Sequence, residues 1–335
     1  MKRLVIGGLW LVAAAIPSSL HAQRTHLLIV SGLGGEPQYS QQFRAFGLSL
    51  VDAALKRYGM SDSDVVFLAE EGAKDARIGG LSTKQNVEAT LTKFAQRTRP
   101  GDQIVLVLIG HGSGSADESK ISLPGPDMSA RDFARDLAAF KAQQVAFVDL
   151  TSASGDMLPL LSAANRVVIT ATKSSFERNE SVFARHFVAA LTGDGADVDK
   201  DGRVSLLEAY RYAITETRRY YEDQGQLQTE HAQLDDDGDK QGTADPQMRV
   251  VSGNADGALA RRVFLGRGTY ASAAGANDPR LASLYKERFA IEARLDELKK
   301  RKASLSAGAY DDALENVLVE LAMKAREIRA LEGRS

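Results

Sequence analysis

Short apolar runs alternate along most of the chain with longer segments whose apolar residues recur every three or four positions. Apolar runs predict strands buried on both faces of a sheet, and three-four spacing predicts amphipathic helices. The expected strands are 26–31, 64–69, 103–110, 144–150 and 166–172. The expected helices are 40–58, 86–96, 128–141, 155–163, 180–191 and 206–222, with a short hairpin at 121–125. This alternation predicts an α/β fold with a mainly parallel sheet flanked by helices.

The last part of the chain follows a different pattern. After the small and polar residues 271–278, leucine and isoleucine recur at three-four spacing, first in 281–305 and again in 314–331. Two such helices, separated at Gly308, predict a coiled-coil-like helical hairpin over 279–335. The residues expected to line the second helix are Leu314, Leu318, Leu321, Ile328 and Leu331. The hairpin is either an arm for homo-dimerisation or docking, or a pair of helices packed on the body.

The first 22 residues have the pattern of a secretory signal. Lys2 and Arg3 precede the apolar run 4–16, and small residues follow up to Ala22. The run is shorter than the roughly 20 residues that span a bilayer. We therefore expect cleavage after Ala22 and a periplasmic or secreted protein with no membrane span after signal removal. An uncleaved N-terminal anchor is the alternative.

Composition excludes several classes of function. The 335 residues include no cysteine, which excludes disulfides, thiolate metal sites and a cysteine nucleophile. A net charge of −2 gives no basic field that would attract nucleic acid. The length corresponds to roughly two domains. We expect an α/β domain over 23–225, an acidic loop region and linker over 226–278, and then the hairpin.

Reactive residue types follow two of the expected strands. The strand 103–110 leads into His111 and Gly112, and the strand 144–150 leads into Thr151, Ser152 and Ser154. The carboxyl ends of parallel strands meet at one edge of a sheet, where α/β proteins gather their functional groups. We therefore expect these two loops to lie side by side.

The segments LVLIGHGSG at 106–114 and VDLTSASGD at 148–156 resemble the legumain–caspase–gingipain (clan CD) peptidases, most closely the bacterial legumain-like peptidases C13. The resemblance implies a caspase/legumain-like fold over about 24–225. It also implies that His111 is the catalytic histidine, that the Gly112 N–H belongs to the oxyanion hole, and that Ser152 takes the position of the catalytic cysteine. The segment 172–180 falls where that family lines its specificity pocket, so Glu177 and Arg178 would contact substrate. A helix N-terminal loop is the other interpretation of this segment.

The absence of cysteine is a departure from that family. A serine hydroxyl needs a base within hydrogen-bond reach, usually oriented by a third group, for which Asp149 and Asp156 are the candidates. The leading interpretation is a degenerate homologue, a pseudoenzyme that binds peptide or protein segments without cleaving them. An active endopeptidase with Ser152 as nucleophile and His111 as base is the second. A structural or assembly protein acting through its C-terminal arm is the third. A shift of the nucleophile to Thr151 or Ser154 also stays open.

The segment 197–208, DVDKDGRVSLLE, matches the EF-hand calcium loop at each diagnostic place. Carboxylates stand at loop positions 1, 3, 5 and 12, a glycine at position 6, and carbonyl and hydroxyl donors at positions 7 and 9. The expected calcium ligands are Asp197, Asp199, Asp201, Arg203 through its carbonyl, Ser205 and Glu208. The alternative is an acidic turn that caps the following helix and holds no metal.

A second acidic turn lies at 234–242. It holds four aspartates around a glycine but lacks the spaced final glutamate of an EF-hand. The carboxylates are Asp235, Asp236, Asp237 and Asp239, with His231 close by in the sequence. Metal binding and an ordinary solvated turn both fit this pattern.

Overall fold

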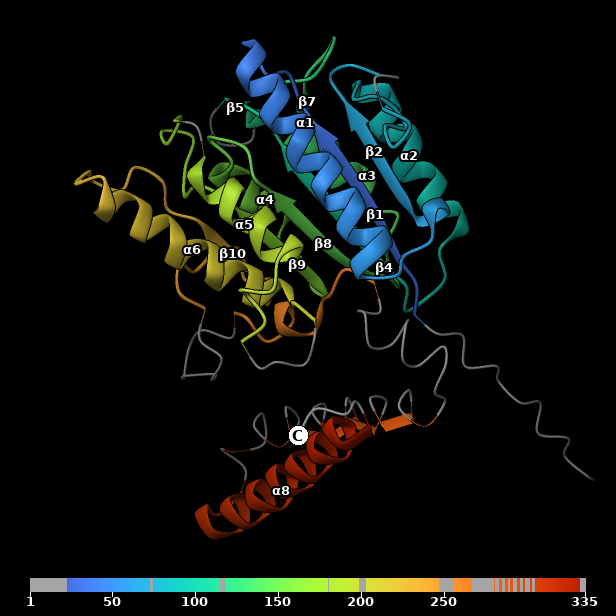
Figure 1. Cartoon of the computed structure of the whole chain (residues 1–335), viewed down its shortest axis with the longest axis vertical. Coiled ribbons are helices and arrows are strands. Elements are labelled where there is room, and N and C mark those ends of the chain that lie inside the picture. The colour runs from blue at the N-terminus through green and yellow to red at the C-terminus, as the bar shows by residue number, and fades with distance from the viewer. Residues whose placement is uncertain are drawn as a thin grey trace, which may run out of the picture.

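The computed structural model describes residues 23–72, 75–114, 118–179, 181–198, 203–246, 256–266 and 305–331, together with scattered positions between 280 and 302. The expected signal segment 1–22 lies outside the described residues. Figure 1 shows a layered α/β unit and, outside these layers, the C-terminal helix α8.

A seven-stranded sheet forms the centre of the α/β unit, in the order β10-β9-β8-β4-β1-β2-β3. The strands are β1 Thr25–Ser31, β2 Val65–Ala69, β3 Gly80–Leu81, β4 Gln103–Ile109, β8 Gln144–Asp149, β9 Arg166–Thr170 and β10 Gln233–Asp235. All neighbours pair in parallel except β10, which runs antiparallel to β9. The expected mainly parallel sheet is confirmed.

Helices cover both faces of this sheet. They are α1 Pro37–Asp52, α2 Lys84–Arg97, α3 Ala130–Leu137, α4 Leu158–Leu161, α5 Val182–Thr192 and α6 Leu206–Asp223. Helices α1, α5 and α6 share one core cluster, and α2, α3 and α4 share the other. In Figure 1, α1, α5 and α6 lie on the near face of the sheet.

The long inner strands are largely apolar because both of their faces are covered. Along β1, Leu27 and Ile29 face the cluster of α1 and α5, whereas Leu28 and Val30 face the cluster of α2 and α3. All four side chains are fully buried. Side chains alternate between the two faces of a strand, so a strand buried on both sides loses the polar positions of a half-exposed one.

Several elements differ from the sequence expectation in extent. The expected helix 40–58 is α1, which begins earlier at Pro37 and is continued by a π-helical turn, Ala53–Arg57. The expected helix 128–141 begins only at Ala130, because Met128–Ser129 forms strand β7 and Ser129 caps α3. The expected helix 155–163 is a 3₁₀ turn, Gly155–Met157, followed by α4.

A small antiparallel sheet follows β4. Its strands are β5 Gly112–Ser113, β6 Lys120–Ile121 and β7 Met128–Ser129. Strands β6 and β7 form the hairpin expected around 121–125. Because β5 begins one residue after His111, the small sheet fixes the path of the chain as it leaves the main sheet.

The α/β unit extends past residue 225, where the sequence suggested that it ends. Strand β10 adds to the edge of the sheet after α6, so the loop 197–208 lies between β9 and β10 along the chain. Leu259, Val263 and Leu265 are buried in the same core as α5 and α6. The segment 256–266 therefore belongs to the body, although its sequence is too short to predict an element.

The C-terminal hairpin is present where the structure describes it. Helix α8 spans Ala307–Leu331, and Val317 packs against Ile291 and Leu295 of the preceding helical segment. Leu318, which the sequence placed in this seam, is instead 46% exposed. Within the part of the chain that the structure describes, no helix is both long and apolar enough to cross a membrane.

Candidate functional site

His111 and Ser152 lie at the same edge of the sheet. His111 follows the end of β4 and Ser152 follows the end of β8, and these two strands are parallel neighbours with Leu108 opposite Asp149. The expected juxtaposition of the two loops is therefore present. The backbone N–H of Gly112 donates a hydrogen bond to Ser152 Oγ at 3.3 Å. Gly112 is required here, because a Cβ at this position would collide with the carbonyl oxygen of Ser152.

The chain makes a left-handed turn directly after Ser152. Ala153 has a φ of +56°, a conformation that costs a non-glycine residue about 1 kcal/mol or more. Two hydrogen bonds hold the turn: the Ala153 N–H donates to the Glu177 carbonyl at 2.8 Å, and Ser119 Oγ donates to the Ala153 carbonyl at 3.3 Å. The surrounding loops thus fix the backbone that carries Ser152.

His111 is oriented by a backbone carbonyl that the sequence does not predict. Its Nε2 lies 3.2 Å from the Gly34 carbonyl oxygen in the turn after β1. A carbonyl only accepts, so Nε2 is the donor and carries a proton. The rings of Tyr39 and Phe43 pack edge-on against the imidazole, each with centroids 5.1 Å away. A backbone acceptor has no side-chain signature, and the glycine-rich turn Gly32–Gly35 was the only signal in the sequence.

The other two hydroxyl groups of the loop after β8, those of Ser154 and Thr151, are buried inside the protein. Ser154 is fully buried, accepts from the N–H groups of Ala171 and Thr172, and shares a hydrogen bond with Thr172 Oγ1. Thr151 is fully buried as well, and Ser152 is 3% exposed. Of the three hydroxyls, that of Ser152 accepts the Gly112 N–H. Among the described residues, no hydrogen bond joins Ser152 to His111.

Asp149, a candidate for the orienting group, contacts its own loop. It is fully buried at the end of β8, and its Oδ1 accepts the Thr151 N–H at 2.9 Å. Burial raises the pKa of Asp149 to about 7, against the effect of the hydrogen bonds from Thr151. No hydrogen bond to His111 is found for Asp149 or Asp156 within the described residues. The hydrogen-bond partner of His111 in the structure is the Gly34 carbonyl, and neither of the two candidate carboxylates.

Glu177 holds backbone in place rather than standing free for a substrate. Its Oε2 accepts the N–H groups of Lys173 and His231, each at 3.0 Å, and its Oε1 lies 2.6 Å from His231 Nδ1. Arg178 donates from Nε to the Ser175 carbonyl at 2.9 Å. The loop after β9 is thus tied both to the turn after Ser152 and to the chain before β10.

The loop 197–208 is described only at its two ends. Asp199 and Asp201 lie outside the described residues. Glu208 Oε1 accepts the Val198 N–H at 3.1 Å, which brings the two ends of the loop together. Ser205 caps α6 by accepting the Glu208 N–H, and Glu208 Oε2 accepts the Ser205 N–H at 2.9 Å. Ser205 and Glu208 thus form a capping box at the start of α6. This agrees with the alternative interpretation, in which the acidic turn caps the helix that follows it.

Arg203 and Asp197 are the other two predicted calcium ligands that the structure describes. The Arg203 side chain is buried with its guanidinium 4.0 Å from the centre of the Phe264 ring. The guanidinium is therefore held by the aromatic ring. This contact leaves the backbone carbonyl of Arg203 as the group that could bind calcium. Asp197 stands at the start of the loop; burial raises the pKa of Tyr58 to about 12, and the Asp197 carboxylate acts in the same direction.

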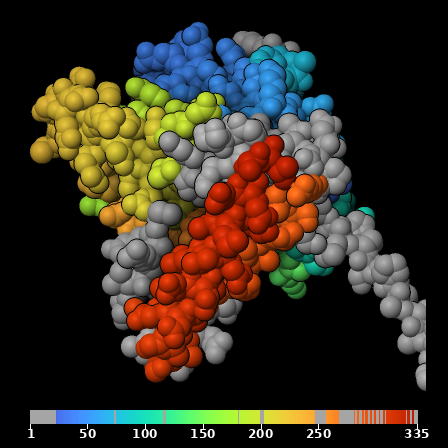
Figure 2. Space-filling model, turned by 60° about the horizontal axis from the view of Figure 1, so that its bottom comes forward, coloured from blue at the N-terminus to red at the C-terminus, as the bar shows by residue number. Residues whose placement is uncertain are grey.

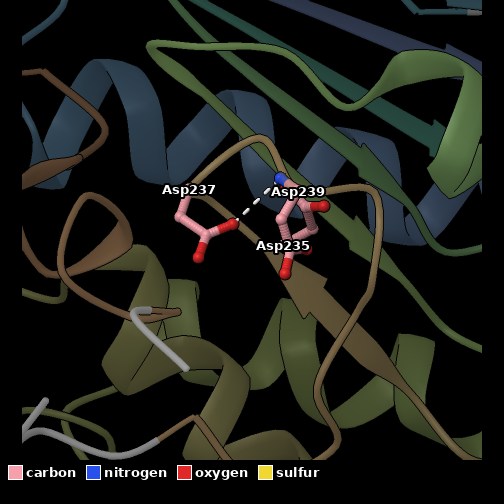
Figure 3. A group of neighbouring side chains, drawn as sticks. All are labelled: Asp235, Asp237 and Asp239. Atoms are coloured by element: carbon pink, nitrogen blue, oxygen red, sulfur yellow. Dashed lines mark hydrogen bonds between the residues drawn. The ribbon is translucent and has the colours of Figure 1, made fainter. Parts of the chain in front are cut away.

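The acidic turn at 234–242 brings three carboxylates together. One oxygen from each of Asp235, Asp237 and Asp239 lies within 4.8 Å of the others (Figure 3), an arrangement that could hold a divalent cation. Asp235 is buried and accepts from Ser162 Oγ at 2.9 Å, whereas the other two are exposed. Exposed acidic groups of this kind are also common without a metal.

Asp236 has a different role from its neighbours. Its carboxylate accepts the N–H groups of Gly257, Leu259 and Ala260 at 2.7 to 3.0 Å. It therefore holds the turn 256–260 against the body. His231, which lies close by in the sequence, is paired with Glu177.

No known family model matches the chain, and no curated protein does. Among solved structures, the crystal structure of protein GSU0716 from Geobacter sulfurreducens aligns with it at 13% sequence identity. The alignment covers 58% of this chain and 89% of that chain, with a TM-score of 0.41. At this score the likeness adds nothing to what the chain's own residues show.

Proposed function

We propose that this chain is an exported, degenerate relative of the legumain and caspase-like peptidases, which binds a peptide or protein segment without cleaving it. The surface for that segment comprises the loops after β4, β8 and β9. The hydrogen bond that Ser152 Oγ accepts carries the proposal. This Oγ takes up the N–H of Gly112, the group that would otherwise stabilise an oxyanion, and no base is bonded to it among the described residues.

The third loop offers an anchor for an apolar side chain of the bound segment. Phe176 is 85% exposed, and the residue after it is bonded to the turn that follows Ser152. Exposed aromatic side chains on a fixed backbone are frequent centres of binding energy. The periplasm or the extracellular space is the compartment that we propose, from the signal pattern of 1–22.

The first prediction is that the protein retains peptides but does not cut them. A mixed peptide library is incubated with the chain from residue 23, with calcium present, and the products and the retained peptides are identified by mass spectrometry. We expect no cleavage by the protein or by Ser152→Ala, and retention of a subset of peptides by both. Phe176→Ser should lower this retention about tenfold or more, because it removes a large exposed apolar contact.

Leu81→Ser is the matched control, since Leu81 is 44% exposed on β3, at the opposite edge of the sheet from β9 and β10. It should retain peptides as the unmodified protein does. Cleavage that disappears in Ser152→Ala would instead establish a serine peptidase and overturn the proposal. Equal retention by Phe176→Ser and Leu81→Ser would show that the peptides bind elsewhere.

We also propose that the loop 197–208 binds one calcium ion and stabilises the body. The ligands would be Asp197, Asp199, Asp201, Ser205, Glu208 and the Arg203 carbonyl. The contact between Val198 and Glu208 supports this, because a calcium loop must bring its first and last ligands to one point. When bound, the ion would join the ends of α5 and α6, which pack on each other.

The second prediction concerns removal of the metal. A chelator should lower the melting temperature by several degrees, because a ligand that binds only the folded state stabilises it. Elemental mass spectrometry should find about one calcium per chain. Asp197→Ala should lose both the metal and the chelator effect, whereas Asp239→Ala in the acidic turn should keep them. If only Asp239→Ala loses the metal and the chelator effect, the metal binds in the acidic turn. If no calcium is found in the unmodified protein or in any variant, the proposal is wrong.

A further inference from the structure

Helix α8 has a second apolar face, opposite the one that packs in the hairpin. Val317 and Ile328 are buried on the hairpin side, while Leu318, Val319 and Met323 are 46%, 51% and 60% exposed. With Ala322 these three form the α8 patch, and the patch lines a shallow groove together with Asp311, Leu314 and Glu315. Figure 2 shows α8 running across the molecular surface.

The charges on this face are separated along the helix. Asp311, Asp312 and Glu315 precede the α8 patch, and Arg326 follows it at the same three-four spacing. All four are exposed, and none has an ion pair among the described residues. Asp311 and Glu315 are like charges four residues apart, and Arg326 has Ala322 and Ala330 at its four-residue neighbours. These four charged residues therefore do not form the i,i+4 ion pairs that usually stabilise a solvent-exposed helix.

We propose that this face pairs with the same face of a second copy of the chain, with the two α8 helices antiparallel about a two-fold axis. An acidic, then apolar, then basic face is complementary to itself only in the antiparallel direction. With the axis between Glu320 and Leu321, Leu318 lies level with Met323 of the second copy. Glu315 then lies level with Arg326 of the second copy, because both are the same number of residues from the axis. A parallel pair would place Glu315 against Glu315.

The inference does not depend on the proposed function, since it rests on α8 alone. The area of one four-residue patch is small, so the association we expect is reversible and concentration-dependent. Two symmetry-related ion pairs at the ends of the patch would fix the direction, as charged groups at interfaces commonly do.

The test is sedimentation velocity on the chain from residue 23, over a series of concentrations. The mass should rise toward that of a dimer. Glu315→Lys and Arg326→Glu should each weaken the dimer about tenfold or more, because each places like charges together at both ends. An equimolar mixture of the two variants should dimerise again, since every end contact in the mixed pair joins opposite charges. The double variant should also dimerise.

Controls for net charge are Glu222→Lys and Arg218→Glu, which alter exposed residues of α6 and should leave the dimer unchanged. Leu318→Glu should abolish it, with circular dichroism confirming an unchanged helix content. A monomer at every concentration would overturn the inference. So would a dimer that Leu318→Glu leaves intact, or single variants that do not recover on mixing.

Discussion

Replacement of Glu230 by alanine is expected to lower the free energy of unfolding by about 3–5 kcal/mol, the largest effect of a single side chain that we predict. Glu230 is 3% exposed. Its Oε1 accepts the Val182 N–H at 2.8 Å, and its Oε2 accepts Ser181 Oγ at 2.9 Å and the Phe183 N–H at 3.2 Å. Truncation would leave these donors, at the first turn of α5, buried without an acceptor.

The carboxylate also joins two parts of the chain that are far apart in sequence. It lies between α6 and β10, and Tyr221 at the end of α6 donates to it at 3.4 Å. Burial raises the pKa of Glu230, and the hydrogen bonds from α5 and Ser181 act in the opposite direction. The N-terminal end of a helix favours a negative charge, which offsets part of the cost of burying the carboxylate.

Urea unfolding measures this effect, with Glu230→Gln and Glu222→Ala as matched variants. Glutamine keeps one acceptor but places an amide N–H₂ against a donor, so a smaller loss of about 1–3 kcal/mol is expected. Glu222 is exposed at the C-terminal end of α6, next to Tyr221. Its replacement should change the free energy of unfolding by no more than about 0.5 kcal/mol. A change in Glu230→Ala that does not exceed that of Glu222→Ala would show that solvent reaches the α5 donors.

The sequence predicts the centre of the sheet because the long strands are apolar on both faces. Strands β3 and β10 have no comparable signal, since they contain two and three residues and β10 ends in an aspartate. Asp235 is buried there because Ser162 and Gly238 donate to it. A polar residue whose partners come from distant segments cannot be assigned to a strand by its own pattern.

Adjacent apolar residues on a helix pose a similar problem. The run Val317-Leu318-Val319 on α8 offers three apolar side chains within one turn, and spacing alone favoured Leu318 for the hairpin seam. The structure places Val317 there instead, against Ile291 and Leu295. The partner helix decides which residue is buried, and that information is absent from the pattern of a single helix.

At the candidate site, the sequence placed His111 and Ser152 together because both follow neighbouring parallel strands. It did not predict the hydrogen bonds that define their chemistry. The acceptor for His111 is the Gly34 carbonyl, and the donor to Ser152 Oγ is the Gly112 N–H. Glu177, expected to contact substrate, binds backbone N–H groups. Backbone groups occur at every residue, so only the folded chain shows which of them are used.

Asp149 is expected to make the protein less stable as the pH rises from 5.5 to 8. Its pKa is about 7 in the folded protein, against an ordinary value of 3.8. Between these two values the folded state binds a proton that the unfolded state has already lost, so stability falls with rising pH. Well below pH 7 the slope is about 1.4 kcal/mol per pH unit, and the loss due to this carboxyl between pH 5.5 and 8 amounts to about 2 kcal/mol. The contribution is lost as the pH rises through the folded pKa.

Asp149→Asn removes this titration while keeping the acceptor for the Thr151 N–H. The variant should therefore be more stable than the unmodified protein at pH 8, and the difference should shrink by about 2 kcal/mol at pH 5.5. Urea unfolding at several pH values measures the difference in unfolding free energy between the two proteins. Other titrating groups contribute equally to both proteins and cancel in this difference. Among these is Asp256, whose pKa burial also raises to about 7. A difference independent of pH would mean that Asp149 stays ionised when buried, held by hydrogen bonds from the loop that carries Ser152.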